Sequence, residues 1–567
     1  MTIAGVASVR FRTVVLVMAF FGTWILHLAL NPAQGLTDDD DFYAPAGVRY
    51  AAWLGAALTD PPRAWNRSAI DAAFTANHEH PPLAKFVFGV THAVFHDALG
   101  IFGSLDGARA GTALFAALMT TLLAGIGFYV GGHAWWVAPL LLLSLPRLFF
   151  HSEVATLDVP VAAMVVAVTA SFLWAEHRGI RAAVLCGVVF GLALLTKLNA
   201  PFAVLPCLLY VLLSRWRGFF VDGASLTLPR VPPALWAMAL LGPVLFVALW
   251  PWLWFDTFQR IGAYVAFHLH HYAIYLFYDG EIWDEPFAPW HASWVLGFGT
   301  LPAPVLVTGL LGAGSAVFSL RRLVRSADAE GRCAGATSAD RILGLSLLQA
   351  VFAISIVSFL NVPKYGGEKL FMPFFPFFCL LAARGVTMVA DALFALVPAI
   401  VPALTARGRA VVVVAVALSA AVPGFVGSAR YHGGFALSYY GELVGGLRGA
   451  VARGFERTYY DVADKELARF LDDHARGRRV HFEPNHKEYV RTYRWLHRDG
   501  VIKQVTLTDK LDAADIVVLT HERRWSTYPA LYDSFVEQPA GQSAKQRVLF
   551  EKRIDGVPLY TVYELRR

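Results

Sequence analysis

The sequence predicts a polytopic α-helical membrane protein that carries a small soluble α/β domain at its C-terminal end. Of its 567 residues, 56% are hydrophobic and only 16% are charged, whereas about a quarter of the residues of soluble domains are charged. Apolar runs long enough to span a bilayer recur between residues 14 and 426. From Arg430 onward charged residues become frequent and the apolar runs end.

The first apolar run, residues 14–30, is preceded by Arg10 and Arg12. Its length is close to the shortest that spans a hydrocarbon core, and the positive flank places the N-terminus in the cytoplasm. No small-residue cleavage site follows and the chain re-enters the membrane, so we do not expect a signal peptide. The polar segment that follows, residues 32–106, is then the first outer segment.

Further apolar runs and the positive loops between them define the topology. The runs are residues 83–102, 108–130, 135–150, 159–175, 182–195, 200–213, 234–254, 294–320, 342–360, 370–383 and 411–426. The basic loops near residues 178, 216, 322 and 408 fall on the cytoplasmic side only if 83–102 and 392–404 do not cross. We therefore expect about 11 to 13 transmembrane helices in the cytoplasmic (inner) membrane, with the C-terminal domain on the periplasmic or extracellular side.

The C-terminal part reads as a small α/β domain, which divides the chain into a membrane domain (1–429) and an outer domain (430–567). Alternating apolar and polar residues at 479–482, 501–505 and 515–519 predict short strands. Helical spacing at 464–474 and 487–498 predicts two helices between them. No catalytic motif is visible there, so docking of an acceptor or a lid is the expected role.

Composition excludes several function classes. The net charge of +6 is spread over short loops without a basic stripe that would bind nucleic acid. The four cysteines form no CxxC or spaced pairs, so disulfides and structural zinc are not expected. No clear ligand set for a divalent metal is present, and we expect no metal or other cofactor.

Two polar clusters of the first outer segment carry the candidate chemistry. The run Asp38 to Asp41 is either a solvated acidic loop or a set of carboxylates facing a substrate, because carboxylates at a membrane boundary are costly to desolvate. Crowded like charges raise at least one pKa, which makes Asp39 and Asp40 candidates for a general base. Residues 77–85 (NHEHPPLAK) hold Glu79, His80 and Lys85 around a Pro-Pro pair, where the ordinary alternative is a loop-to-helix junction.

Polar residues recur at other predicted outer ends of apolar runs. Taken individually, each of these residues is explained equally well as a helix cap, as a long side chain that reaches the membrane interface, or as a ligand of the substrate. Together they place cations and carboxylates at one level, where a leaving phosphate would need them. The residues are Asp158, Lys197, Lys364 and Lys369.

The order of these motifs resembles the C-type glycosyltransferases, and within them glycosyltransferase family 39, the protein O-mannosyltransferases and the lipid A aminoarabinose transferases. The matching segments are Asp39-Asp40 with Tyr43-Ala44, then 79–85 (EHPPLAK), 157–160 (LDVP), 191–197 (GLALLTK), 369–376 (KLFMPFFP) and 439–446 (YYGELVGG). In the aminoarabinose branch a lysine follows the glutamate that matches Glu79. Here His80 follows it, as in the mannosyltransferase pattern.

The resemblance implies an inverting transferase that takes a sugar from a polyprenyl-phosphate donor on the outer membrane face. By position Asp39 matches the catalytic aspartate and Asp40 its acidic partner, while Glu79 and the substrate-positioning Tyr43 and Asp158 orient the substrates. His80, Lys85, Lys197, Lys364 and Lys369 would bind the donor phosphate. The partners would be the lipid-linked donor and a protein, lipid or glycan acceptor.

A transporter or flippase of a lipid-linked sugar is the alternative. Such proteins show repeated halves and ionisable residues near the middle of their helices. Here the first half does not repeat in the second, and the charges gather at one predicted face. A glycosyltransferase is therefore the favoured hypothesis.

Overall fold

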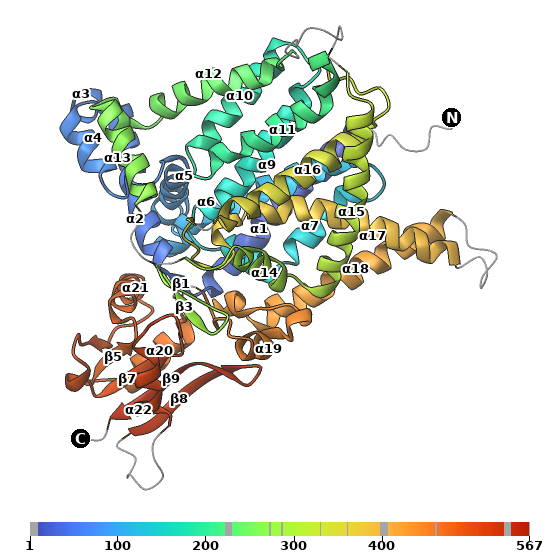
Figure 1. Ribbon diagram of the computed structural model, residues 1–567. Coiled ribbons are helices and arrows are strands. Elements are labelled where there is room, and N and C mark those ends of the chain that lie inside the picture. The colour runs from blue at the N-terminus through green and yellow to red at the C-terminus, as the bar shows by residue number, and fades with distance from the viewer. Residues whose placement is uncertain are drawn as a thin grey trace.

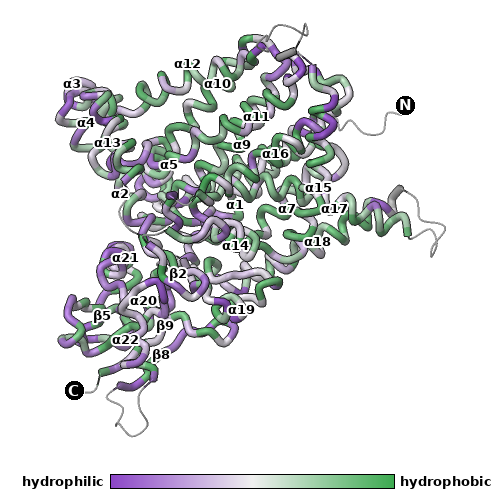
Figure 2. Tube along the Cα trace, viewed as in Figure 1, coloured by the Kyte–Doolittle hydropathy of each residue, from purple (hydrophilic) through white to green (hydrophobic). Residues whose placement is uncertain are grey.

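The structure is a computed structural model that describes residues 9–220, 230–270, 274–284, 287–328, 330–359, 361–396, 406–459, 462–537 and 546–565. It consists of a large helical bundle with a small sheet-containing domain at one end, and Figure 1 shows that domain in orange and red below the bundle. Figure 2 shows that hydrophobic residues dominate the bundle, whereas polar residues are frequent in the sheet domain. The predicted fold class is confirmed.

Seven helices in the described part of the chain are long and apolar enough to cross a membrane. They are α1 (Val9–Leu30), α6 (Ser104–Val130), α9 (Asp158–Ala175), α15 (Ala303–Arg325), α16 (Ser338–Ser355), α17 (Phe374–Leu396) and α18 (Ala406–Arg430). Shorter apolar helices are α7 (Ala134–Leu143), α10 (Ile180–Leu194) and α12 (Pro233–Ala248). The protein is thus a multi-pass membrane protein, while the expected 11 to 13 crossings and their orientation stay predictions.

Residues 32–106, expected to be the first outer segment, are helical almost throughout. Their elements are α2 (Asp38–Thr59), α3 (Pro61–Ala64), α4 (Arg67–Phe74), α5 (Leu83–His92) and a π-helical turn (Ala93–Ala98). The run 83–102 thus forms a 10-residue α-helix followed by this turn, too short to span a bilayer. The acidic run was expected to lie in a loop. It is instead the first turn of α2, because Thr37 caps that helix.

Residues 392–404 were expected not to cross the membrane, and this stays a prediction. Helix α17 continues without interruption to Leu396, so the first part of that segment extends the predicted run 370–383. Residues 397–405 lie outside the described part of the chain.

Helices α2 and α5 cross with their backbones in direct contact. A Cβ atom added at Gly89 of α5 would lie 2.0 Å from the carbonyl oxygen of Gly47 of α2, and one added at Gly47 would lie 2.5 Å from the Lys85 carbonyl oxygen. Only glycine permits this approach, since any side chain would overlap the facing backbone. The crossing fixes the start of α2 relative to the loop before α5.

The C-terminal domain contains a five-stranded sheet in the order β6-β5-β7-β9-β8. Strand β5 pairs in parallel with β6 and β7, and β7, β9 and β8 pair antiparallel. Its elements are α20 (Lys465–His474), β5 (Arg479–Glu483), α21 (His486–Arg498), β6 (Thr506–Leu507), β7 (Ile516–Thr520), α22 (Tyr528–Phe535), β8 (Gln546–Ile554) and β9 (Val557–Leu565). Both predicted helices and the strands at 479–482 and 515–519 are confirmed, but residues 501–505 form no strand.

A short two-stranded ribbon joins the domain to the first outer segment. Strand β1 (Leu36–Thr37) pairs antiparallel with β4 (Val462–Ala463) immediately before α2 begins. The remaining elements are α8 (Pro146–His151), α11 (Val204–Arg215), α13 (Thr257–Leu269), β2 (Leu276–Tyr278), β3 (Glu281–Trp283), α14 (His291–Gly299) and α19 (Gly446–Ala452). Figure 1 shows α21 next to the start of α2.

Candidate active site

A cavity of about 560 Å³ lies where the helical bundle meets the C-terminal domain. Its walls are the first turn of α2, the loop before α5, the 365–369 loop and the C-terminal domain, with α13 at one side. The charged residues that line it are Asp38, Asp39, Glu79, Lys197, Lys369, Glu488, Arg491 and Arg524. Because so many charged groups converge there, we take this cavity as the candidate active site.

The first turn of α2 distributes the acidic run around the helix axis. Thr37 and Asp40 form a capping box, in which each side chain accepts a hydrogen bond from the backbone N–H of the other. Successive residues of an α-helix are about 100° apart, so four consecutive carboxylates meet four different surroundings. Asp38 and Asp39 line the cavity, together with Tyr43 one turn further on.

Asp40 does not face the cavity, although it was the second candidate for the base. Its carboxylate is fully buried and accepts hydrogen bonds from the Arg109 side chain, at 2.6 Å from Nη2 and 3.0 Å from Nε. The Ala155 backbone N–H donates a third, at 2.7 Å, and Thr37 contributes its hydroxyl and its N–H. Asp40 therefore has no position left for a substrate and anchors the start of α2 to α6.

Arg109 is a residue that the sequence analysis did not single out. It is fully buried near the start of α6, in a run that was interpreted as purely apolar. A single arginine within an apolar run is the signal that could have identified it, because such a charge needs a buried partner. The partner, Asp40, is 69 positions away in the sequence.

Asp39 forms an ion pair with Lys369 inside the cavity, with Oδ2 2.6 Å from Nζ. Burial alone would lower the pKa of Lys369, but the carboxylates of Asp39 and Asp158 more than offset this and raise the pKa above its ordinary value. The ammonium group is therefore charged at neutral pH. Burial, helped by Asp39, raises the pKa of Tyr43, so its phenol stays neutral and can donate a hydrogen bond.

The loop before α5 presents Glu79 and His80 to the cavity. Asn77 donates a hydrogen bond to Glu79 Oε1 at 2.9 Å, and the ring of His80 lies 5.5 Å from that of Tyr43. Burial, followed by the nearby Lys85, lowers the pKa of His80 well below its ordinary value. His80 is therefore neutral near pH 7 and can offer a hydrogen bond but not a positive charge.

Lys85, expected to bind phosphate, lies beneath this loop and does not line the cavity. Its fully buried Nζ donates to Asn77 Oδ1 at 2.9 Å and to the His80 carbonyl oxygen at 2.8 Å. Burial also lowers the pKa of Lys85 well below its ordinary value. Its position indicates that it shapes the loop that carries Glu79.

The other predicted cations divide in the same way. Lys197 lines the cavity, and its Nζ lies 2.5 Å from Asp158 Oδ1 at the buried start of α9. Asp158 thus stands behind Lys197 and orients it. Lys364 does not line the cavity, because its Nζ donates to the carbonyl oxygens of Phe359 and Val362 at 3.0 and 3.2 Å.

The 364–369 loop is attached to the bundle by a buried ion pair below the cavity. Glu368 accepts from Arg147 of α8 at 2.7 Å, and His151 lies 3.3 Å from the same carboxylate. Burial would raise the pKa of Glu368, but Arg147 and His151 outweigh it and lower the pKa to about 2. This carboxylate is therefore ionised and holds the loop that positions Lys369.

The C-terminal domain supplies the wall that the sequence did not predict. Trp495 of α21 donates a hydrogen bond to Asp41 Oδ1 at 2.7 Å, and the Arg491 guanidinium lies over the Phe42 ring at 4.7 Å from its centre. Asp41 is thus held by α21. Asn485, Glu488, Arg491, Arg524 and Trp525 line the cavity from this side. No sequence motif marked them, because the contact joins segments about 450 residues apart.

The lining of this cavity combines carboxylates, which can accept a proton, with cationic side chains, which can bind an anion. Its lining contains four carboxylates and four cationic side chains, so charged and polar groups of a donor and an acceptor would each find partners. Within the described residues, one group of three side chains, His92, His96 and Asp97, has ligand atoms within 4.8 Å of one another, and none of the three lines the cavity. The expectation that no metal takes part stays a prediction.

No protein-family model matches the sequence, and no curated protein matches it. Among solved structures, the ArnT from Cupriavidus metallidurans bound to undecaprenyl phosphate is similar at 16% sequence identity and a TM-score of 0.49, over 98% of both chains. The same ArnT in the apo state gives 16% identity and a TM-score of 0.48, over 97% of both chains. The archaeal oligosaccharyltransferase AglB from Archaeoglobus fulgidus, in complex with an inhibitory peptide and a dolichol-phosphate, gives 12% identity and a TM-score of 0.46, over 92% of this chain and 71% of that one.

Proposed function

We propose that this protein is an inverting membrane glycosyltransferase, which transfers a sugar from a polyprenyl-phosphate donor to a protein, lipid or glycan acceptor on the outer face of the cytoplasmic membrane. The observation that carries the proposal is the position of Asp39. This carboxylate faces a cavity at the end of the bundle, paired with Lys369 at 2.6 Å and with Lys197 on the same lining. The motifs around these residues resemble those of C-type glycosyltransferases.

In the proposed step, Asp39 accepts the proton of an acceptor hydroxyl while the hydroxyl oxygen attacks the anomeric carbon of the donor sugar. A new carbon–oxygen bond forms as the bond between the anomeric carbon and the phosphate oxygen breaks, in line and with inversion. The bonding electrons leave with polyprenyl phosphate, which gains a negative charge. Cationic side chains that meet this charge lower the barrier.

Lys369 and Lys197 are the residues proposed to meet the leaving phosphate, because both are cationic groups on the lining. Neutral His80 would add a hydrogen bond, and Glu79 would orient a sugar hydroxyl. Lys369 would move from the Asp39 carboxylate toward the phosphate when the donor binds. That exchange would leave Asp39 free to take the proton.

The test compares three Asp→Asn variants of the full-length protein in detergent or nanodiscs. Each is incubated with a radiolabelled undecaprenyl-phosphate sugar and an envelope extract as acceptor, and release of undecaprenyl phosphate is measured. Asp39→Asn should abolish release in a folded protein, whereas Asp60→Asn, at a partly exposed site outside the cavity, should leave it unchanged. Asp40→Asn should mainly lower stability, because Arg109 loses its buried ionic partner.

Full activity of a folded Asp39→Asn protein would contradict the proposal. A flippase would move labelled lipid between leaflets of a vesicle without releasing undecaprenyl phosphate. The same labelled donor in sealed vesicles therefore separates the two functions. Comparing the mass of envelope glycans and glycoproteins with and without active protein would then identify the sugar and the acceptor.

A further inference from the structure

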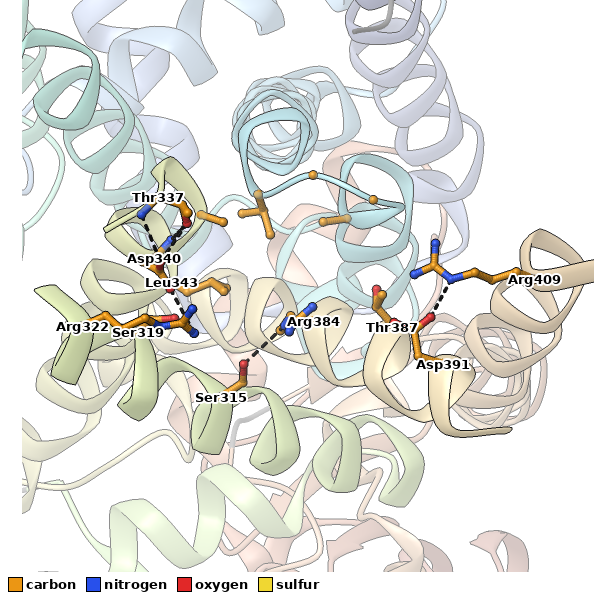
Figure 3. A pocket seen from close by; sticks show the side chains of 15 residues that line it. Ser315, Ser319, Arg322, Thr337, Asp340, Leu343, Arg384, Thr387, Asp391 and Arg409 are labelled. Carbon is orange, nitrogen blue, oxygen red and sulfur yellow. Dashed lines mark hydrogen bonds and ion pairs between the residues drawn. The ribbon is translucent and has the colours of Figure 1, made fainter. Parts of the chain in front are cut away.

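A second cavity, of about 440 Å³, lies among the ends of the membrane helices and has no contact with the C-terminal domain. It is lined by the end of α6 and by α15, α16, α17 and α18 (Figure 3). Helix α6 has 27 residues and therefore extends about 40 Å. The N-terminal end of α6 lies beside Asp499 of the C-terminal domain, whereas its last residue, Val130, lines this second cavity. The two cavities are therefore at opposite ends of the bundle.

Arg384 is the central charged residue of this cavity. It lies near the middle of the 23-residue helix α17, which is otherwise apolar enough to cross a membrane. Within the described residues its one hydrogen-bond partner is the Ser315 hydroxyl, 3.3 Å from Nε. A charge within a membrane helix costs several kcal/mol unless it meets a partner, and such residues usually face the bundle interior or a water-filled cavity and mark functional sites.

Two further arginines flank Arg384, and each already has a carboxylate. Arg322 lies 3.3 Å from Asp340, and Arg409 donates to Asp391 at 2.6 Å. Figure 3 shows Arg384 between these two pairs, with its guanidinium toward the cavity. Among the described residues, three arginines and two aspartates line the cavity, so this lining carries a net positive charge.

We propose that this cavity binds the phosphate-bearing headgroup of an anionic membrane phospholipid. A guanidinium presents a planar fork of N–H donors that matches phosphate oxygens, and the hydroxyls of Ser319 and Thr387 line the same space. The volume lies in the range of small-molecule sites. Apolar side chains on the same helices, Phe318 of α15 and Val411 of α18, are exposed and can contact the acyl chains. This proposal is independent of the transfer reaction.

The test uses the full-length protein in detergent, with thermal unfolding and native mass spectrometry as readouts. The probes are phosphatidylglycerol, phosphatidylcholine with the same acyl chains, and inorganic phosphate. Phosphatidylglycerol should raise the unfolding temperature most, and Arg384→Gln should weaken its binding by about 10- to 100-fold, as expected for the loss of one charge-assisted contact. Arg321→Gln, one residue from Arg322 but outside the cavity, is the matched control and should bind as the wild type does.

Each result decides one part of the proposal. Equal binding of phosphatidylcholine, or unchanged binding of phosphatidylglycerol to Arg384→Gln, overturns it. Inorganic phosphate that alone reproduces the effect, and loses it in Arg384→Gln, supports the anion site but assigns it to a free anion. If Arg384→Gln does not fold, Arg384→Lys is used instead, because it keeps the positive charge but lacks the planar set of N–H donors of the guanidinium. Weaker binding of phosphatidylglycerol to Arg384→Lys then supports the proposal, and unchanged binding contradicts it.

Discussion

Charged side chains around the candidate active site belong to two groups with different roles. Asp39 and Lys369 face the cavity and contact each other. Asp40 and Lys85 are fully buried behind it and hold segments of backbone in place. Substitutions in the first group should change activity in a folded protein, whereas substitutions in the second should change stability first.

Replacement of Lys369 by glutamine should lower kcat/KM for the polyprenyl-phosphate sugar by about 100-fold or more, the usual cost of losing one stabilising charge at a transition state. Lys364→Gln is the control, because Lys364 lies on the same loop but binds backbone carbonyls away from the cavity. It should stay within a few-fold of the wild type. Steady-state release of polyprenyl phosphate measures both. Equal losses would show that the loop, and not the Lys369 charge, is what matters.

Glu368 should make stability depend on acid pH. Its pKa is about 2 in the folded protein against an ordinary 4.5, so it stabilises the fold above about pH 4.5, and this contribution, on the order of 3 kcal/mol, is lost as the pH falls toward 2. Glu368→Gln should therefore be less stable than the wild type near pH 7, with a smaller difference near pH 3. Unfolding curves at both pH values test this. The exposed Glu281→Gln should follow the wild type, and parallel pH dependence in Glu368→Gln would contradict the assignment.

At the residue scale, the sequence predicted most of the bundle's charged residues at the site, but not which member of the acidic run faces the cavity. Asp39, Glu79, His80, Lys197 and Lys369 all line the cavity as a group. The sequence could not separate Asp39 from Asp40, because their difference arises from the helical turn and from Arg109, a residue within an apolar run. Side chains from the C-terminal domain were missed because only tertiary folding brings them to the site.

At the scale of elements, the crossing of α2 and α5 positions the two polar clusters of the site. Asp39 begins α2, and Glu79 lies in the loop just before α5. The two helices contact each other through Gly47 and Gly89 without any intervening side chain. The distance between Asp39 and Glu79 therefore depends on Gly47 and Gly89, which have no reactive side chain.

Gly89→Ala should destabilise the protein by about 2 to 3 kcal/mol and lower activity, because its methyl group would overlap the Gly47 backbone. The control is Gly55→Ala on α2, where an added Cβ meets nothing within 4 Å. It should stabilise the helix by roughly 0.5 to 1 kcal/mol. Thermal unfolding and donor turnover of both variants test the contrast. If Gly89→Ala and Gly55→Ala have the same stability and turnover, α2 and α5 can move apart with little loss of folding free energy, and the prediction is contradicted.

The elements of the C-terminal domain show where sequence patterns succeed and fail. Residues 501–505 alternate as a strand would, but the N–H groups of Lys503 and Gln504 bind the Asp472 side chain and do not join the sheet. Strand β8 was not predicted, because Arg547, Glu551 and other charged residues interrupt its apolar pattern. Strand β8 is stabilised by its antiparallel pairing with β9, and the sequence pattern of the strand alone does not contain this information.

At the scale of the whole molecule, the candidate site is shared between two domains. The bundle supplies Asp39 and the lysines, and α21 closes the opposite wall. Trp495 connects the two through its hydrogen bond to Asp41. Substrate binding should therefore depend on how firmly the C-terminal domain is held.

Trp495→Phe should raise KM by about 2- to 10-fold with a smaller change in kcat, since it removes one hydrogen bond while keeping an aromatic ring. Trp290→Phe is the control, because Trp290 is exposed and does not line the cavity. Kinetics with the labelled donor, together with the rate of proteolysis between the domains, measure the effect. A KM equal to the wild type value would show that this contact does not influence binding.

The ribbon formed by β1 and β4 has a consequence for biosynthesis. Its strands are more than 400 residues apart in the chain, so at 5 to 20 residues per second the ribosome takes roughly 20 to 80 s to make the second after the first. Throughout that interval the acidic turn of α2 has been made but the segment before it has no partner strand. Both strands must also reach the same side of the membrane, so the cavity can be completed only after the C-terminal domain has been made and has met the segment that precedes α2.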